Sequence, residues 1–314
     1  MIYGKYAARM LTVMALIGVG LTVLSGCHAK SHHYVFKSKS GHEVPRIVST
    51  VPAATQILLQ LRAGRSLVAV STYDKPLLAG RWRKLPVIGN YLRLNTELMT
   101  ELHPSRLILQ IDPALIPADI RSLCHRLDCR IIDIKLNSVA DLEHTTLRLG
   151  AAAGCVGRAR LAVVKLAREI RVITRQAARV PIVPVIYCLS TNPLRIVGGK
   201  NFMDDELRLA GGRNVGRQLG DGFPKITHAE LLRLNAKKIL VWHPESVFHH
   251  AYRWLQRRYG GRVCRIAWPD ADLLTLSVVH KIRRINLLIH APATDRAGAE
   301  SAPALHQERK RRPA

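Results

Sequence analysis

The fold is decided by residues 46–74, RIVSTVPAATQILLQLRAGRSLVAVSTYD, which predict a strand, a helix and a second strand. The first apolar run is typical of a buried strand. Pro52 suits the first turn of a helix, which we expect over 52–64 with Gly64 closing it. A second apolar run, 66–72, completes the unit. Two strands joined through a helix form the unit from which parallel sheets are built.

The same alternation of strand and helix continues along the chain. Residues 96–110 and 228–242 both contain a short Leu-rich helix, a polar turn and a hydrophobic strand, which indicates two similar lobes. Further strands are expected at 106–110, 130–134, 181–190, 237–242 and 262–268, and helices at 96–104, 116–127, 202–212, 226–235, 245–261 and 275–290. This order predicts an α/β protein whose sheets are mostly parallel and flanked by helices.

A long helical stretch, residues 138–179, separates the two groups of strands. Gly154 and Gly157 either kink this stretch or split it in two, because glycine costs ~1 kcal/mol relative to alanine inside a helix. We therefore expect an N-terminal α/β lobe over 45–137, a connecting helix, and a C-terminal α/β lobe over 180–290.

The N-terminus has the pattern of a secretory signal. Lys5 and Arg9 precede an apolar run shorter than the ~20 residues of a membrane span, so residues 1–26 are expected to be a signal peptide. The LSGC sequence that ends at Cys27 resembles the bacterial lipobox, which implies acylation of this cysteine, palmitate included. Residues 27–44 would then be a lipidated tether. The alternative is an ordinary signal peptide with a chance cysteine.

The chain is strongly basic, with a formal net charge of +26 and a pI near 10.6. Lys and Arg are spread along every segment without interleaved aromatics or zinc-ligand spacing, so nucleic acid is not expected as a partner. A solvated basic surface that favours anionic lipid or an anionic ligand is the preferred interpretation. Residues 291–314 lack periodicity and are expected to form a disordered basic tail.

Five cysteines follow Cys27, so they cannot all pair with one another; they are Cys124, Cys129, Cys155, Cys188 and Cys264. A disulfide between Cys124 and Cys129 is conceivable in an oxidising compartment. We favour buried thiols, since a helix end followed by a strand does not obviously provide the geometry for a bridge.

Several segments, taken in order, resemble those of one protein family. Residues 46–74 resemble its opening strand, S-x-x-P-x-x-T-x-x-x-x-x-L-x-x-G helix and second strand, and 85–109 resemble its L-P-x-V-G-x-Y-x-x-x-N-x-E-x-x-x-x-L-x-P segment. Residues 192–216 and 223–241 follow in family order, so the resemblance covers 45–290. The family is that of the class III periplasmic substrate-binding proteins, which deliver cobalamin, haem or ferric siderophores to ABC importers. It implies two lobes with limited relative motion and a largely preformed cleft.

The resemblance is closest to the cobalamin-binding branch, in which aromatic side chains from both lobes pack against the ligand. Tyr73, Tyr91 and Phe223 stand at the matching positions. Aromatic rings suit this role because they offer a broad apolar surface with few rotamers to lose. Arg93 and Arg195, near the same loops, are further candidate ligand-binding residues. Cobalamin is therefore the expected ligand; local core packing of each aromatic is the alternative role.

A ferric siderophore or haem is the alternative ligand. Siderophore-binding members tend to use arginine, and haem-binding members often use a tyrosine oxygen or a histidine as an iron ligand. Tyr91 or His243 could serve in this way, although neither has a recognisable partner in the sequence.

The family also carries one exposed carboxylate on each lobe that docks into arginines of the permease. Glu97 matches the N-lobe position; the simpler interpretation is that it favours a helix N-terminus capped by Asn95. In the second lobe Ala229 occupies the matching position and Glu230 lies one residue further on. Either Glu230 substitutes or the docking is asymmetric.

The sequence contains no catalytic signature such as a G-x-S-x-G elbow, so the protein is not expected to be an enzyme, nor to hold a resident metal or cofactor. We expect a monomer in the periplasm, anchored to a membrane by lipid, or at the cell surface if the source has no outer membrane. Its partner would be an ABC permease with its ATPase. An exported lipoprotein enzyme and a receptor that works without a transporter are the alternatives of other classes.

Overall fold

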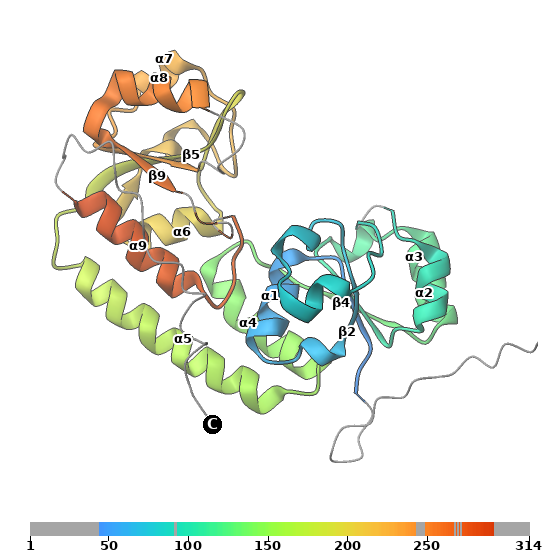
Figure 1. The fold of residues 1–314 in the computed structure, drawn as a ribbon. Helices are drawn as coiled ribbons and strands as arrows, with labels where there is room; N and C mark the ends of the chain where they lie inside the picture. Colours follow the sequence, from blue (N-terminus) through green and yellow to red (C-terminus); the bar gives the residue numbers. More distant parts are fainter. Residues whose placement is uncertain are drawn as a thin grey trace, which may run out of the picture. The chain divides into compact units, whose positions relative to one another are not determined.

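The computed structural model describes residues 44–90, 93–242, 249–266, 268, 270 and 272–291, shown in colour in Figure 1. The expected signal peptide, Cys27 and the basic tail lie outside these ranges, apart from Ala291. Within the described ranges, no helix combines the length and the apolar character needed to cross a membrane.

Four short parallel strands form the N-terminal sheet in the order β2-β1-β3-β4. Most of their apolar side chains are buried, as for Val48 paired with Leu107, whereas Val68 and Ile131 are half-buried. The strands are β1 (Ile47–Ser49), β2 (Leu67–Val70), β3 (Arg106–Leu109) and β4 (Arg130–Asp133), and the helices are α1 (Pro52–Gln60), α2 (Thr96–Leu102) and α3 (Ala118–Arg126). The predicted alternation of strands and helices is confirmed in this lobe.

The end of α1 differs from the prediction. The helix stops at Gln60, and the residue with left-handed backbone is Arg62, at φ 56°, instead of Gly64. Gly64 begins a short 3-10 turn and is needed for a different reason: a Cβ there would lie 2.6 Å from the Trp82 ring. The glycine was therefore assigned the wrong role, since it serves side-chain packing and not the helix end.

The connecting stretch is split into two helices, α4 (Val139–Ala152) and α5 (Val156–Ala177). The break contains Gly154 at φ 65°, so of the two outcomes left open by the sequence the structure shows a split. Ser138 caps α4, since its side chain accepts from the N–H of Asp141 while the Asp141 carboxylate accepts from the N–H of Ser138. This is a capping box, which satisfies N–H groups that the helix cannot bond internally.

The C-terminal sheet has the order β6-β5-β8-β9, with β7 also paired to β5. All pairs are parallel except that of β5 with β6, which form a hairpin. The strands are β5 (Val183–Thr191), β6 (Leu194–Ile196), β7 (Gly212–Asn214), β8 (Lys238–Trp242) and β9 (Val263–Ile266), and the helices are α6 (Phe202–Leu209), α7 (His228–Arg233), α8 (His249–Tyr259) and α9 (Val278–His290). The expected strands and helices form, whereas β6 and β7 were not predicted.

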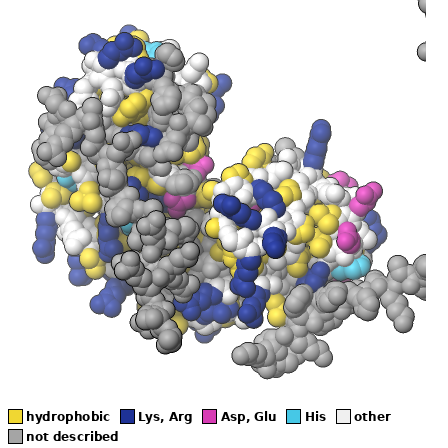
Figure 2. Space-filling model, viewed as in Figure 1, with side chains coloured by type: hydrophobic (Ala, Val, Ile, Leu, Met, Phe, Trp, Pro, Cys, Tyr) yellow, Lys and Arg dark blue, Asp and Glu magenta, His cyan; other side chains and the backbone are white. Residues whose placement is uncertain are grey.

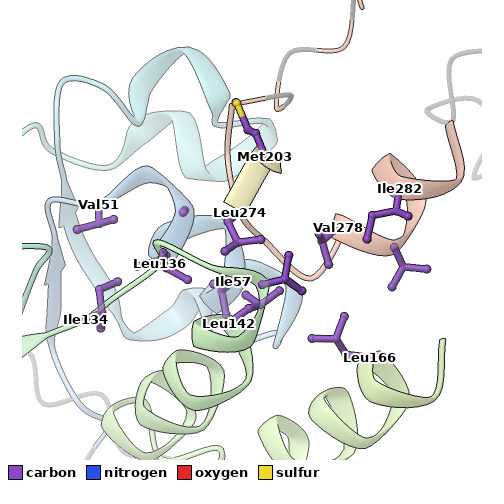
Figure 3. Packing of buried hydrophobic residues seen from close by; sticks show 14 of the residues in the cluster. Val51, Ile57, Ile134, Leu136, Leu142, Leu166, Met203, Leu274, Val278 and Ile282 are labelled. Carbon is purple, nitrogen blue, oxygen red and sulfur yellow. The ribbon is translucent and has the colours of Figure 1, made fainter. Parts of the chain in front are cut away.

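One hydrophobic cluster includes residues from both lobes and from the connecting helices (Figure 3). Ile57 of α1 and Leu142 of α4 belong to the same cluster as Leu166 of α5, Leu274 and Val278. Each is at most 3% exposed, and full burial of such a side chain is worth about 1.5–3 kcal/mol. The connecting helices are therefore held by packing to elements on both sides of them.

The five described cysteines are free, as the sequence interpretation favoured. Four of them are buried, and Cys264 is half-buried. Cys124 and Cys129 lie within hydrogen-bonding reach of each other, and the N–H of Cys129 donates to the carbonyl of Cys124 at 2.8 Å.

Candidate functional site

Tyr73 lies in the loop directly after β2, at the carboxyl end of the N-terminal sheet, with 56% of its surface exposed. The next residue, Asp74, is fully buried. Its carboxylate accepts hydrogen bonds from the N–H of Ser71 at 3.0 Å and from the Ser71 hydroxyl at 2.6 Å. The buried Asp74 carboxylate thus fixes the loop on its core side, while the Tyr73 ring is exposed to solvent.

The Asp74 carboxyl is held in an environment that disfavours its charge. Burial raises its pKa above the usual value, and hydrogen bonds from Ser71 and Thr55 offset part of the rise. Thr55 also donates to the Ser49 hydroxyl at 2.9 Å, which links this loop to the end of β1. The base of the Tyr73 loop is therefore a small buried polar network, which orders the loop only while its hydrogen bonds are made.

The Tyr73 loop is joined to the segment that leads to Tyr91. The N–H of Thr72 donates to the carbonyl of Gly89 at 2.9 Å, and the Thr72 hydroxyl bonds to the same oxygen at 3.2 Å. Gly89 has φ 101°, and a Cβ there would lie 2.2 Å from the carbonyl oxygen of Arg93. Only glycine fits this position. Tyr91 itself lies outside the described residues.

The residues flanking Tyr91 are hydrogen-bonded to each other. The N–H of Asn90 donates to the carbonyl of Arg93 at 3.0 Å, and the N–H of Arg93 donates to the Asn90 side-chain oxygen at 2.9 Å. The Arg93 side chain is exposed. In the N-lobe, therefore, the structure brings Arg93 and the flanks of Tyr91 next to the loop that carries Tyr73.

In the C-lobe the structure brings Arg195 and Phe223 together. Arg195 belongs to β6 and pairs with Ser190 near the carboxyl end of β5. Its guanidinium donates to the backbone carbonyl of Phe223 at 3.0 Å, while 39% of the Phe223 surface is exposed. One role of Arg195 is therefore to position the loop that carries the phenylalanine.

A second set of hydrogen bonds fixes the same loop. The N–H of Gly198 donates to the Gly222 carbonyl at 2.8 Å, and the N–H of Gly222 donates to the Gly199 carbonyl at 2.7 Å. The Asn201 amide donates to these three glycine carbonyls at 3.1 to 3.2 Å, and its oxygen caps α6. The two consecutive glycines, Gly198 and Gly199, thus join the loop that carries Phe223 to the segment ahead of this helix.

Both groups of residues lie at the carboxyl ends of their sheets, where open α/β folds bind ligands. Within the part of the chain that the structure describes, no hydrogen bond or ion pair joins Tyr73 or Arg93 to Arg195 or Phe223. The arrangement has apolar rings and cations on separately fixed loops. It is suited to binding a large ligand and contains no nucleophile–base pair in hydrogen-bonding contact among these side chains.

The two expected docking carboxylates have different surroundings. Glu97 is exposed in the first turn of α2, whose cap is Asn95, because the Asn95 oxygen accepts from the N–H of Leu98 at 2.9 Å. Glu230 instead completes a capping box in α7: its carboxylate accepts from the N–H of Thr227 at 2.7 Å and from its hydroxyl at 2.9 Å. These bonds lower the Glu230 pKa. The T-x-x-E spacing could have revealed this role.

Sequence reasoning treated two tryptophans only as strand residues. Trp242 is half-buried at the carboxyl end of β8, paired with Ile266 of the neighbouring strand. Trp268 follows that strand, is 8% exposed, and has the Arg284 guanidinium 4.2 Å from its ring centre. An aromatic residue at the carboxyl end of a parallel strand is the signal that could have identified Trp242 and Trp268 as further candidates, because ligands bind at this end of such sheets. His243, the alternative iron ligand, lies outside the described residues.

A buried ion pair between two helices of the C-lobe was also not predicted from the sequence. The Lys281 ammonium on α9 lies 2.9 Å from the Glu206 carboxylate on α6, and both side chains are at most 2% exposed. Lys281 also donates to the Leu273 carbonyl. Burial raises the pKa of Glu206 to about 6, and Lys281 opposes that rise. The pattern of three consecutive acids, Asp204 to Glu206, gave no indication that the last one is buried.

Comparison with known proteins gives a consistent result. A family model described as periplasmic binding protein matches residues 47–252. The chain is 24% identical over 206 residues to the vitamin B12-binding protein of Vibrio parahaemolyticus, covering 65% of this chain and 70% of that protein. It is 23% identical over 206 residues to the vitamin B12-binding protein of Vibrio vulnificus, covering 65% and 71% of the two chains.

Solved structures show the same fold. The periplasmic vitamin B12 binding protein of Vibrio cholerae superimposes with a TM-score of 0.65 at 20% identity, covering 78% of this chain and 96% of that one. The periplasmic haem binding protein of Vibrio cholerae has a TM-score of 0.68 at 17% identity, covering 79% and 99%. The chain therefore belongs to the periplasmic binding protein family and is a class III substrate-binding protein of the kind that serves ABC importers.

Proposed function

We propose that this protein captures a metal-chelate nutrient, with cobalamin as the first candidate, between the aromatic loops of its two lobes and delivers it to an ABC importer. The relatives that match the sequence over 206 residues are vitamin B12-binding proteins, which supports cobalamin at low identity. The family and fold are those of binding proteins, and the family's location is periplasmic or extracellular. Capture and hand-over require no bond to be made or broken.

The observation that carries the proposal is that Tyr73 and Phe223 are exposed on loops fixed by buried or multiply bonded polar groups. The Asp74–Ser71 bonds fix the first loop, and the Arg195 and Asn201 bonds fix the second. An exposed ring on a fixed loop loses little conformational entropy on binding. Large flat chelates such as a corrin are the ligands that gain most from such rings.

A ferric siderophore or haem is the second candidate. The haem-binding protein of Vibrio cholerae matches this fold as well as the cobalamin-binding one does. Arg93 is an exposed cation beside the Tyr73 loop and could bind an anionic chelate. Arg195 is less suited to that role, because its guanidinium already bonds to the Phe223 carbonyl.

Equilibrium titration of the purified full chain with cyanocobalamin, haemin and a ferric siderophore, followed by absorbance and calorimetry, tests the proposal. We expect cyanocobalamin to bind with a Kd below about 10 μM, corresponding to about −7 kcal/mol. Binding of haemin or the siderophore alone would select the second candidate. Failure of all three to bind would contradict the importer role as stated and favour a receptor or an exported enzyme.

We propose that an acylated cysteine attaches the mature protein to a membrane. We expect export to remove residues 1–26 and acylation to anchor Cys27, with the stretch to residue 44 as a tether. Mass spectrometry of the mature N-terminal peptide from membranes tests this, with Cys27→Ser as the matched variant. A non-acylated N-terminus on the wild-type chain would contradict lipidation.

A further inference from the structure

Helix α5 packs through one narrow stripe. Its buried residues are Ala159, Leu166, Ile173 and Ala177. At about 100° per residue these four lie within an arc of about 40°. Half-buried residues flank this stripe, among them Ala162 and Ile170, which pack against the core. The opposite side of this 22-residue helix, about 33 Å long, faces outward.

Three large apolar side chains lie on this outer face and not in the core. Leu161 is 73% exposed, Val164 68% and Val172 41%. On the same angular scale they lie within about 80° of one another and roughly opposite the buried stripe. Exposed apolar residues grouped on one face of a helix mark an interaction surface more often than residues scattered singly.

Cations surround these apolar residues. Six lie exposed on the helix: Arg158, Arg160, Lys165, Arg168, Arg171 and Arg175. Glu169 is the single carboxylate of α5 and is half-buried. Among the described residues, none of the six cations forms an ion pair. In Figure 2 Lys and Arg side chains gather over α5, at the lower left.

We propose that the outer face of α5 binds the surface of an anionic phospholipid bilayer. A helix with apolar side chains between arginines lies in the plane of a membrane interface, with the apolar groups among the acyl chains and the cations at the headgroups. Each Lys or Arg near an anionic surface strengthens binding about fivefold. A second copy of this face would repel the first because both carry the same six cations. Nucleic acid is disfavoured because the face has no aromatic residue for stacking.

Vesicle sedimentation with the full chain carrying Cys27→Ser tests the proposal without an acyl chain. The vesicles are phosphatidylcholine alone or with about 30% phosphatidylglycerol. We expect binding to the anionic vesicles to exceed binding to the neutral ones by at least tenfold. The triple variant Lys165→Glu, Arg168→Glu, Arg171→Glu should lower binding to anionic vesicles at least about 100-fold. Residues 1–26 are present in both chains, so a difference in binding between the two comes from the substitutions in α5.

The matched control reverses three exposed arginines elsewhere, Arg126→Glu, Arg130→Glu and Arg213→Glu, for the same change in net charge. If this control loses as much binding as the α5 variant, net charge alone is responsible and the proposal is wrong. Equal binding to neutral and anionic vesicles would also overturn it. Thermal melting verifies that both variants fold, and a milder set, Lys165→Ala with Arg168→Ala and Arg171→Ala, should give an intermediate loss.

The apolar part of the face has its own test. Leu161→Ser with Val164→Ser should weaken binding to anionic vesicles about tenfold and make the remainder more sensitive to salt, because only the screened electrostatic attraction is left. Analytical ultracentrifugation without vesicles measures whether the chain forms a dimer through this face instead. A dimer that these two substitutions abolish would assign the face to a second copy of the chain and overturn the proposal.

Discussion

At the scale of single residues, the proposed site depends on groups that position an aromatic ring by bonding to the loop that carries it. Asp74 and Ser71 fix the Tyr73 loop from below, and Arg195 fixes the Phe223 loop by bonding to a backbone carbonyl. The sequence motif selected Tyr73 and Phe223 as candidate rings, and both are exposed in the structure; their role in binding stays a prediction. It could not identify Asp74, since the burial of this loop carboxylate depends on the fold, which places Ser71 and Thr55 as its hydrogen-bond partners.

Tyr73→Ala is expected to weaken binding of the cognate chelate about tenfold or more, because truncation of an exposed ring at the centre of a contact removes its apolar area. Calorimetric titration with the ligand that wild type binds measures the change. Tyr73→Phe retains the ring and should bind nearly as well as wild type. Equal loss in the two variants would assign the contribution to the hydroxyl, as in iron ligation, and unchanged affinity in both would remove Tyr73 from the site.

At the scale of helices and strands, the sequence predicted those elements whose apolar pattern is strong. The Asn95 cap of α2 is confirmed at 2.9 Å. The strands β6 and β7 were missed because each has three residues, too few for a periodic pattern, and is defined by pairing with β5. Gly64 was misread because a glycine near a helix end usually takes a left-handed conformation, whereas here its missing side chain makes room for Trp82.

The contact of α4 with α5 depends on another glycine. A Cβ at Gly150 would lie 2.3 Å from the Cβ of Ala159, so Gly150→Ala should lower the free energy of unfolding by about 1–3 kcal/mol. Gly157 is the matched control, because it lies in the first turn of α5 and a methyl group added there would meet no atom within 4 Å. Gly157→Ala should raise stability by about 0.5–1 kcal/mol. Urea unfolding measures the change in the free energy of unfolding for both variants. An equal change in Gly150→Ala and Gly157→Ala would contradict close packing at Gly150.

The buried pair of Glu206 on α6 and Lys281 on α9 makes stability depend on pH. Folding raises the Glu206 pKa from 4.5 to about 6, so the folded state favours the protonated acid. The stability that protonated Glu206 contributes is fully present below about pH 4.5 and is lost as the pH rises through 6. The free energy of unfolding should therefore decrease by about 2 kcal/mol over this range.

Urea unfolding of wild type and Glu206→Gln between pH 4 and pH 7 isolates that contribution. The difference in stability between the two proteins should shift by about 2 kcal/mol across this range, in favour of the variant at the higher pH. Glu101→Gln, at an exposed position, should follow the wild-type profile. A Glu206→Gln profile parallel to that of wild type would show that the carboxyl titrates normally in the fold.

At the scale of the whole molecule, the order of the segments was enough to identify the family, whereas the contacts between lobes could not be read from the sequence. Gln60 at the end of α1 donates to the Ser277 hydroxyl at 2.8 Å and accepts from the N–H of Leu276 at 3.1 Å. Asp205 of α6 accepts from the N–H of Val139 at the start of α4. These bonds join residues from 66 to 217 positions apart, and no local pattern encodes them. They supplement the shared apolar cluster in restricting motion between lobes.

Glu97 is the expected docking carboxylate of the N-lobe, a role that concerns transport and not the fold. Glu97 is exposed, and Asn95 already caps its helix, so Glu97→Lys should leave folding and ligand affinity close to wild type. If the carboxylate docks to a permease cation, reversal of its charge should slow delivery about tenfold, since charge pairs at a contact rim set the association rate and register.

Glu101→Lys, one turn further along the same helix, is the matched control and should transport normally. Uptake of labelled ligand by cells with the cognate permease measures both variants. Normal uptake by Glu97→Lys would leave this carboxylate only its favourable interaction with the helix N-terminus, worth about 0.3–1 kcal/mol.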